Sequence, residues 1–587
     1  MPGCVGCLRA RAPRDATECA AVSEPASTAL DERAAGTWGG RREALWVLAL
    51  SLLAPLVVFR DVWLSRFTQA LGDTYDGRLN AFFIEHSWGW LTRRPVDRSF
   101  WGLPDFFPHG ENALAYSDPM VSFGPLYWPW RAMGLPADVS FALWGMAVVA
   151  VSVAAGYALL RLTVRLSPAS AAVGAWLIAC SASRIHQISH AQLLPTFYVS
   201  AGLAGAIGWA RAESVRVRSA CAALAAASLV AQLYGGFYHG LFLGIVVMVL
   251  AVCALLVRAT RSEIVRRARA DWLVLLAIGA LTAAALWPWA AHYRAAQSVV
   301  GARGWEEVLP MVPRPATWFY MTPRALFYRW TRHVVAFRSL PWDFEHAMGL
   351  GILTTAGVVV AAWRARQRVG VKLAVATTLV LIVATTMVHG HTLWRYVFDH
   401  VPGVGAARAL SRIGLLLPFA AAVVLGTWAD SLRGRARALA LALLVGCAVE
   451  QLASLDVHDR EVQRRWVGEV ARQVDRNAAA FVVTRSTDRG GAMLVHLDAM
   501  FAAQITGVPT VNGASGSDPP GWYGLQWARV RNEVAERAFR ESLDAWLRSG
   551  AVDPARVQWI RLAPNFRSAE ALQRRPRSPR ARAHTPR

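Results

Sequence analysis

The side chains best suited to chemistry gather in one polar stretch of the sequence, residues 72–118, which lies between apolar runs. Carboxylates recur in this stretch among Tyr, Trp, Phe and His side chains. A carboxylate beside a hydroxyl group can act as a general base, and grouped carboxylates can bind a divalent metal. Because ionisable groups are costly to hold at a bilayer without a function, we predict a catalytic site here. The candidates are Asp73, Asp76 and Asp118 for catalysis, with Asp105 and His109 for substrate binding.

The alternative for these aspartates is structural, because aspartate also caps helices and forms turns in solvated loops. Asp73 and Asp76 follow the first apolar run by only a few residues, so we expect both near the membrane surface. This position makes Asp73 the leading candidate for the base.

A second motif, SRIHQISHAQ, covers residues 183–192 at the end of an apolar run. His186 and His190 are four residues apart and share one face if the helix continues. That geometry suits a divalent metal or a phosphate group, and Gln192 is a further substrate-binding candidate. The two histidines could equally be interfacial side chains that pack against neighbouring helices.

A third motif, ARALSR, places Arg408 and Arg412 four residues apart at the predicted start of an apolar helix. A helix N-terminus favours anions, and arginine binds phosphate through charge-assisted hydrogen bonds. We therefore predict that both arginines bind a lipid-linked phosphate. Ordinary contact of these long side chains with lipid headgroups is the alternative.

The segment 292–345 alternates charged and aromatic residues, for example in TWFYMTPRALFYRW. Such a pattern suits an interfacial helix that covers a lipid or sugar site, although a purely structural amphipathic helix explains it as well. Glu345 and His346 at its end are further substrate-binding candidates.

The elements that must position these side chains are membrane helices. Hydrophobic residues make up 55% of the 587 residues and charged residues only 17%. Several apolar runs have roughly 18 to 22 residues, enough to cross a hydrocarbon core of about 30 Å. We predict an α-helical polytopic membrane protein with about eleven transmembrane helices. The runs are 43–64, 139–160, 168–184, 191–210, 219–235, 237–257, 272–291, 346–363, 371–389, 409–428 and 438–453.

The formal charge of +23 could suggest nucleic-acid binding, but the arginines fall in short clusters between alternate apolar runs. Arginine-rich loops face the cytoplasm, so the clusters set topology and no nucleic-acid partner is expected. With a cytoplasmic N-terminus, every cluster lies inside, and the outer side holds the large loop 65–138, the loop 292–345 and the C-terminal region. The clusters are 161–165, 211–218, 258–269, 364–368 and 433–437.

Four regions follow from these patterns. Residues 1–42 are predicted to be a disordered cytoplasmic tail, and 43–454 the transmembrane domain. Residues 455–566 read as a small extracytoplasmic α/β domain, with strands near 478–484, 508–511 and 557–562 and helices near 497–505 and 527–548. The basic tail 567–587 is predicted to be disordered. Within the outer loop, 121–133 is too short to span and is expected to be interfacial or re-entrant.

Several segments together resemble the GT-C class of bacterial integral-membrane glycosyltransferases, in particular the proteins described as YfhO-like or as dolichyl-phosphate-mannose-type transferases. They are the loop opening with Gly72, Asp73, Leu79 and Asn80, then FFPHGENALAYSDP, SRIHQISHAQLL, VPGVGAARALSRIGLL and PTVNGASGSDPPGW. The resemblance covers most of residues 45–525.

The resemblance implies a polyprenyl-phosphate-linked sugar donor, an acceptor in the cell envelope and transfer on the extracytoplasmic side of the bacterial inner membrane. It also implies an essential acid in the first outer loop, at the position of Asp73. Related groups carry a DxD motif there, whereas two residues separate Asp73 from Asp76. A divalent metal, Mg or Mn, is therefore left open as a cofactor.

Two alternatives to an inverting glycosyltransferase remain. A non-enzymatic transporter of lipid-linked glycans would need ionisable residues in mid-membrane, and most spans are free of charge in their centres. An envelope-assembly component would instead use the C-terminal region to bind glycan or protein partners.

Overall fold

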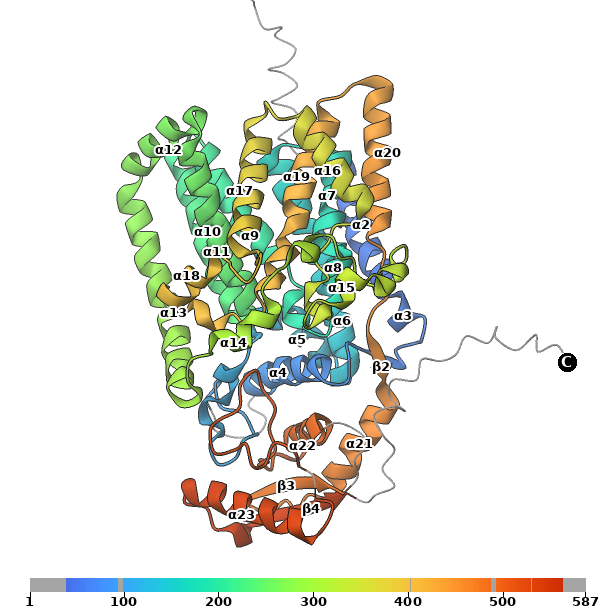
Figure 1. Ribbon diagram of the computed structural model, residues 1–587, viewed down its shortest axis with the longest axis vertical. Helices are drawn as coiled ribbons and strands as arrows, with labels where there is room; N and C mark the ends of the chain where they lie inside the picture. Colours follow the sequence, from blue (N-terminus) through green and yellow to red (C-terminus); the bar gives the residue numbers. More distant parts are fainter. Residues whose placement is uncertain (1–38, 93–98, 402, 487–491, 529, 563–587) are drawn as a thin grey trace, which may run out of the picture.

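The computed structural model describes residues 39–92, 99–401, 403–486, 492–528 and 530–562 and is mostly helical. The tails predicted to be disordered, 1–42 and 567–587, lie almost wholly outside the described residues. The chain forms a bundle of helices, and a smaller C-terminal segment packs against one end of that bundle (Figure 1).

Each of the eleven apolar runs contains one helix of this bundle. A bilayer offers the backbone no water, so an apolar segment satisfies its own N–H and C=O groups by forming a helix. The helices are α2 (Arg41–Val58), α6 (Ala137–Ala158), α7 (Pro168–Cys180), α9 (Phe197–Arg211), α10 (Val215–Gly235), α11 (Phe237–Leu256), α13 (Trp272–Val300), α16 (Ile352–Arg364), α17 (Val369–Thr385), α19 (Leu417–Asp430) and α20 (Gly434–Glu450).

Six segments of the described chain are helical, long and apolar enough to cross a membrane, so the count of eleven spans is not confirmed. Some runs are only partly α-helical. The run 409–428 begins as the 3-10 helix η10 (Leu410–Leu416), and α19 starts only at Leu417, followed by Pro418. Proline fits the first turn of a helix, where its missing N–H costs nothing. The six segments are Ala137–Val164, Ala191–Arg211, Val215–Gly235, Phe237–Leu256, Trp272–Val300 and Leu410–Asp430.

The arginine-rich connections lie together at the end of the bundle opposite the C-terminal segment (Figure 1). Arg211 donates to the carbonyl of Thr163 at 2.6 Å, which joins two of these connections. Arg267, on the helix α12 (Arg258–Ala270), donates to the carbonyl of Ala212 at 2.6 Å. This common end is what the alternating arginine clusters predict. Which end faces the cytosol stays a prediction.

The loop 65–138, which the sequence predicts to lie outside, is more ordered than its polar sequence suggests. Helix α4 (Asp76–Leu91) runs through its first half, where the sequence predicted only a loop. Its buried residues include Leu79, Phe82 and Phe83, whose spacing of three and four residues is helical. The segment 121–133, expected to be interfacial, forms the 3-10 helix η2 (Val121–Leu126) and the short α5 (Trp128–Ala132).

The C-terminal segment has mixed α/β structure, with β3 (Ala480–Arg485) parallel to β4 (Val557–Leu562). These two strands are confirmed, whereas 508–511 contributes a single bridge, from Thr510 to Phe481. Helix α22 (Ala492–Thr506) is longer than predicted, and α23 (Glu533–Ser549) begins late because Asn532 caps it by accepting from the N–H of Ala535. Helix α21 (Arg460–Gln473) was not predicted.

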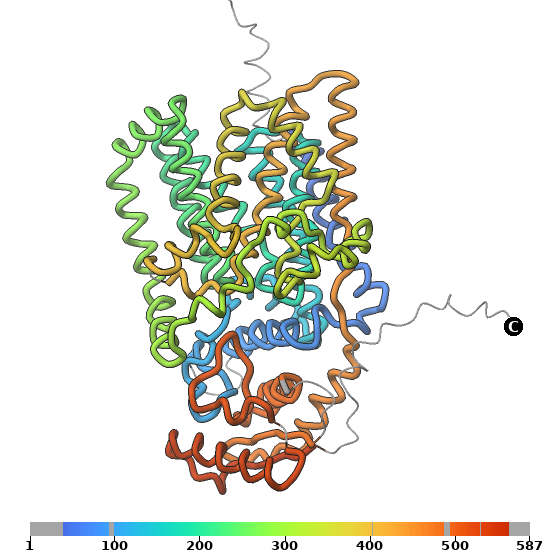
Figure 2. Tube along the Cα trace, viewed as in Figure 1, coloured from blue at the N-terminus to red at the C-terminus, as the bar shows by residue number. Residues whose placement is uncertain are grey.

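The C-terminal segment packs on the loop 65–138 (Figure 2). Strand β2 (Val457–Asp459) pairs antiparallel with β1 (Gln69–Leu71), the strand that precedes Asp73. Side chains of both regions belong to one hydrophobic cluster, which contains Phe106 and Leu114 together with Leu497 and Trp522. An independent domain at 455–566 stays a prediction.

Candidate functional site

Four polar side chains from separate parts of the chain meet at the end of the bundle, beside the start of α4. His190 Nε2 lies 3.4 Å from Asp76 Oδ2 and 4.0 Å from Glu345 Oε1. Glu345 lies in the 3-10 helix η8 (Asp343–His346) and pairs with Arg412 of η10. The structure thus brings together one member of each motif that the sequence singled out.

Arg412 and Glu345 form a closed ion pair. Arg412 Nε donates to Glu345 Oε2 at 2.9 Å and Nη2 donates to Oε1 at 2.5 Å. Their side chains are only 4% and 3% exposed, and the Arg412 guanidinium lies 4.8 Å from the centre of the Tyr238 ring. Burial alone would raise the pKa of Glu345, but the charge and hydrogen bonds of Arg412 outweigh it and hold that pKa at about 2. The charge of Arg412 is therefore largely neutralised.

Arg408 is the solvent-exposed cation of the site. Its side chain is 39% exposed, and its nearest carboxylate is Glu307, at 3.9 Å. Glu307 also forms an ion pair with Arg303 and is therefore shared. Because the α-helix starts only at Leu417, Arg408 and Arg412 lie before its N-terminus and not at the start of an α-helix as the sequence predicted.

The two aspartates of the first outer loop have different surroundings. Asp73 Oδ1 accepts from the N–H groups of Tyr75 at 3.0 Å and Gly77 at 2.9 Å, so this oxygen caps the start of α4. The Asp76 side chain is 48% exposed. Desolvation by the crowded surroundings, followed by the negative charge of Asp73, raises the pKa of Asp76 to about 6. Asp76 is therefore the carboxylate better placed to exchange a proton near neutral pH.

Asp118 and Gln192 lie together at the start of α11. Asp118 Oδ1 accepts from the N–H of Phe237, the first residue of that helix, at 2.7 Å. Burial raises the pKa of Asp118, although this bond and one to Gln192 act in the opposite direction. Asp118 therefore stabilises a helix N-terminus beside the site, and its carboxylate is buried.

His186 and His346 have both ring nitrogens occupied. His186 Nε2 donates to the carbonyl of Phe344 at 3.0 Å, so Nδ1 accepts from the Thr322 hydroxyl at 2.8 Å. Burial and the charge of Arg324 lower the pKa of His186 to about 4. His346 makes the corresponding pair of bonds, to the Pro310 carbonyl and the Thr317 hydroxyl. Both rings are neutral and hold the wall of the site.

Asp105 and His109 lie at the contact with the C-terminal segment. His109 Nε2 is 2.8 Å from Ser549 Oγ, and its ring lies edge-on to Trp546 at 4.6 Å. Asp105 is fully buried. The structure does not bring either residue into contact with Asp76, and their predicted substrate role stays untested.

Sequence reasoning missed three contributors to the site. Gln187 Nε2 donates to Glu345 Oε2 at 3.4 Å, and Tyr238 packs on Arg412. The Phe344 ring lies parallel to the His190 ring, with centroids 6.3 Å apart, and it is 40% exposed. The only sequence signal was position, because each residue lies beside a residue already singled out or at the end of an apolar run.

A large apolar cavity lies within the bundle. It has a volume of about 2090 Å³ and walls from α9, α11, α13, α17 and α19. At one end it is lined by Ile413, the neighbour of Arg412, and at the other by Arg433 and Arg437. A cavity of this volume with mostly apolar walls can hold an extended apolar chain.

A metal site is not evident. Within the residues that the structure describes, no group of three His, Cys, Asp or Glu side chains is arranged to hold a metal ion. Asp76 and His190 offer two donors, fewer than the three protein ligands typical of catalytic metal sites such as zinc. The divalent metal stays an untested prediction.

No protein-family model and no curated protein match the chain. Two solved structures of the mycobacterial arabinofuranosyltransferase AftD are similar to it at 17% identity. One covers 78% of this chain and 30% of AftD with a TM-score of 0.42, and the other, of a mutant, covers 84% and 35% with a TM-score of 0.45. The chain thus spans about a third of the length of AftD.

Proposed function

We propose that this chain is an inverting glycosyltransferase that moves a sugar from a polyprenyl-phosphate donor to an envelope acceptor on the outer side of the bacterial inner membrane. One observation carries the proposal: a half-exposed carboxylate, Asp76, and an exposed cation, Arg408, act on each other in one site, and an apolar cavity of the bundle comes up to Ile413, the residue next to Arg412 of that site. A lipid-linked sugar phosphate has the matching parts, namely an apolar chain, an anion and a reacting carbon.

In the proposed reaction, the lipid chain lies in the cavity and its phosphate faces Arg408. The Asp76 carboxylate accepts the proton of the acceptor hydroxyl, whose oxygen attacks the anomeric carbon on the side opposite the phosphate. The new carbon–oxygen bond forms as the bond to the phosphate oxygen breaks, with inversion. The polyprenyl phosphate leaves with its electron pair, and Arg408 stabilises the negative charge.

The buried groups position the exposed ones. His190 is neutral, because burial and the charge of Arg412 lower its pKa to about 3, and it lies against Asp76 and Glu345. The Arg412–Glu345 pair holds η8 to η10 and so fixes Phe344 beside His190. In this mechanism these residues set geometry and do not exchange protons.

The donor can be tested by binding. Purified protein is incubated in detergent with a synthetic polyprenyl phosphate or with the same polyprenol lacking phosphate, and bound lipid is measured by native mass spectrometry. Polyprenyl phosphate should bind, and Arg408→Gln should weaken it about tenfold to a hundredfold, the value of a charge-assisted hydrogen bond. Equal binding of the polyprenol, or no effect of Arg408→Gln, would contradict the proposed donor site.

One observation favours the alternative of a lipid-linked glycan transporter. The cavity extends from the neighbour of Arg412 to the arginines at the opposite end of the bundle, so it passes through much of the bundle. A reconstituted protein that moves a fluorescent polyprenyl-phosphate sugar between leaflets, without glycosyl transfer to any acceptor, would support this function instead.

A further inference from the structure

The loop that carries Asp73 and Asp76 is attached to the C-terminal segment on the side that precedes it. Strand β1 ends at Leu71, and the N–H of the next residue, Gly72, donates to the Asp456 carbonyl at 2.9 Å. The buried imidazole of His458 binds the carbonyl of the same glycine through Nδ1 at 2.9 Å. Both backbone polar groups of Gly72 are therefore held by residues more than 380 positions away in the sequence.

A buried ion pair holds the loop on its other side. Arg78 Nη2 donates to Asp498 Oδ1 at 2.6 Å, with side chains 1% and 0% exposed. Asp498 lies on α22 of the C-terminal segment, and the Arg78 guanidinium also lies 5.5 Å from the centre of the Phe501 ring. This contact falls only two residues after Asp76.

The contact continues along α4. Tyr75 packs with Trp466 and Leu494 in a small cluster. One turn beyond Arg78, the Phe82 carbonyl accepts from Gln504 Nε2 at 3.0 Å, and the Phe82 ring lies edge-on to Phe501 at 5.7 Å. The start of α4 thus lies directly on the C-terminal segment.

The face of α4 that contacts the C-terminal segment is not the face that carries Asp76. With about 3.6 residues per turn, side chains two positions apart point in nearly opposite directions. Arg78 turns toward Asp498, and Asp76 turns toward His190. A rotation or shift of α4 on the C-terminal segment would therefore move Asp76 relative to His190 and Arg408.

Stability alone gives little reason for this ion pair, because a buried pair replaced by apolar residues of similar size is often neutral or stabilising. We propose that Arg78 and Asp498 are positioning residues, through which the C-terminal segment sets the placement of Asp76 in the site. This role rests on the proposed function. It makes the C-terminal segment part of the catalytic unit.

The test removes the two charges of this pair in the double variant Arg78→Met/Asp498→Leu. Thermal unfolding reports the cost to the buried Arg485, whose charge also acts on Asp498. The matched control is Arg218→Met/Asp271→Leu, which removes a buried ion pair at the opposite end of the bundle. Both proteins are compared with wild type by amide hydrogen exchange, thermal unfolding and steady-state transfer from a polyprenyl-phosphate sugar. The single variant Asp498→Asn is a poorer choice, because it leaves the Arg78 charge buried and unpaired and can fail to fold.

The first double variant should exchange faster over residues 72–80 and lose about a hundredfold in kcat with little change in KM, because misplacement of a reacting group acts on the chemical step. The control should change neither quantity. Unaltered exchange over 72–80, or an equal loss of kcat in the control, would overturn the positioning role. If the wild type transfers no sugar, the proposed function fails, and the exchange measurement still decides whether this contact holds the loop.

Discussion

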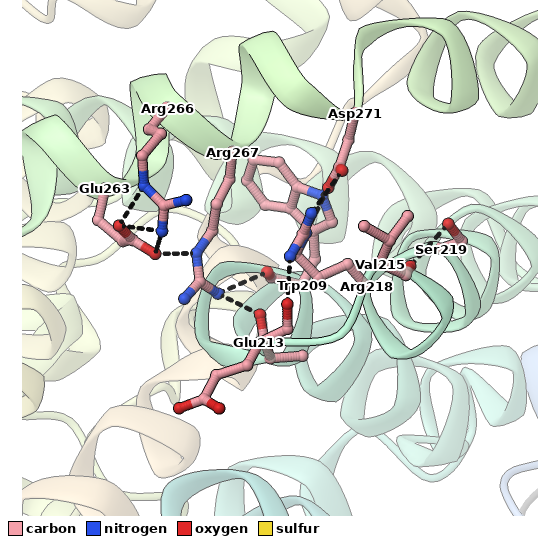
Figure 3. A network of polar contacts seen from close by, with 10 residues as sticks. Trp209, Glu213, Val215, Arg218, Ser219, Glu263, Arg266, Arg267 and Asp271 are labelled. Carbon is pink, nitrogen blue, oxygen red and sulfur yellow. Dashed lines mark hydrogen bonds and ion pairs between the residues drawn. The ribbon is translucent and has the colours of Figure 1, made fainter.

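Two buried arginine–carboxylate pairs lie at opposite ends of the bundle and differ in what surrounds them. At the arginine-rich end, Arg218 binds both oxygens of Asp271, at 2.6 Å and 2.7 Å, and a third donor goes to the Glu213 carbonyl (Figure 3). Trp209 Nε1 also donates to Asp271. At the other end, Arg412 binds both oxygens of Glu345 in the same fashion, but the exposed Asp76 and Arg408 stand beside it.

This difference distinguishes a purely structural ion pair from one that belongs to a candidate reactive site. Around Arg218 and in the neighbouring Glu263–Arg267 pair, polar groups are matched to one another and join the ends of α9, α10, α12 and α13 (Figure 3). At the other end, the buried pair is matched, while a carboxylate and a cation remain accessible to a ligand. A preorganised site needs polar groups that are free to bind a ligand, such as Asp76 and Arg408, beside a rigid ion pair such as Arg412–Glu345.

The largest expected effect is on transfer by Asp76→Asn, which removes the proposed base and keeps the shape of the side chain. Transfer should fall about a hundredfold to ten-thousandfold, the usual contribution of a general base. The measurement is product formation by reconstituted protein from a panel of polyprenyl-phosphate sugars. The control is Asp73→Asn, whose amide oxygen can still cap α4 and which should lose far less. A larger loss in Asp73→Asn would return the role of base to Asp73.

Glu345→Gln should distinguish, by its effect on stability, the buried ion pair of the site from the exposed groups beside it. It leaves the Arg412 charge buried without its partner, which costs about 3 to 5 kcal/mol. The loss is measured by thermal or denaturant unfolding of the purified protein. Arg408→Gln, at an exposed position with only a distant partner, should leave stability almost unchanged. Similar losses in both variants would show that the Arg412–Glu345 pair is not the rigid part of the site.

The alternation of apolar runs and arginine clusters was enough to predict a helical bundle with its arginines at one end. Local patterns also predicted β3 and β4, because short apolar strands flanked by turns are recognisable. Helix α4 was missed because its aromatic residues stand among polar ones, and because its buried face is completed by α22, more than 400 residues away. The helix propensity of a segment depends on nearby residues only, so it cannot predict a contact with α22.

The site could be predicted only in part, for the same reason. Sequence position marked Asp76, His190, Glu345 and Arg412, and the structure places them together. The sequence alone could not show that Glu345 neutralises Arg412, since the pair joins residues 67 positions apart. Nor could it show that Asp73 caps α4 while Asp76 is exposed, because both aspartates have the same local character until the helix start is known.

The pH dependence of transfer should reflect Asp76. Its pKa is raised to about 6, so the carboxylate is protonated below that pH and cannot accept a proton. We expect kcat/KM to fall about tenfold per pH unit below 6 and to level off above it. The measurement is the rate profile of wild type between pH 4.5 and 8. In Asp73→Asn the fall should move to lower pH, because the negative charge of Asp73 contributes to the raised pKa of Asp76. A limb near pH 4 would mean that the base is a carboxylate with an ordinary pKa.

The smallest expected effect is that of removing one hydrogen bond to His186, in the wall of the site. Thr322→Val keeps the shape of a buried side chain and removes the hydroxyl that donates to His186 Nδ1. The unsatisfied nitrogen should cost about 1 to 3 kcal/mol of stability, with transfer reduced only a few-fold because His186 is neutral and touches the site through Phe344. Ser219→Ala, which removes an exposed hydroxyl bond to the Val215 carbonyl at the other end, should change neither (Figure 3). A loss of transfer as large as that of Asp76→Asn, without a loss of stability, would instead place His186 in direct contact with the substrate.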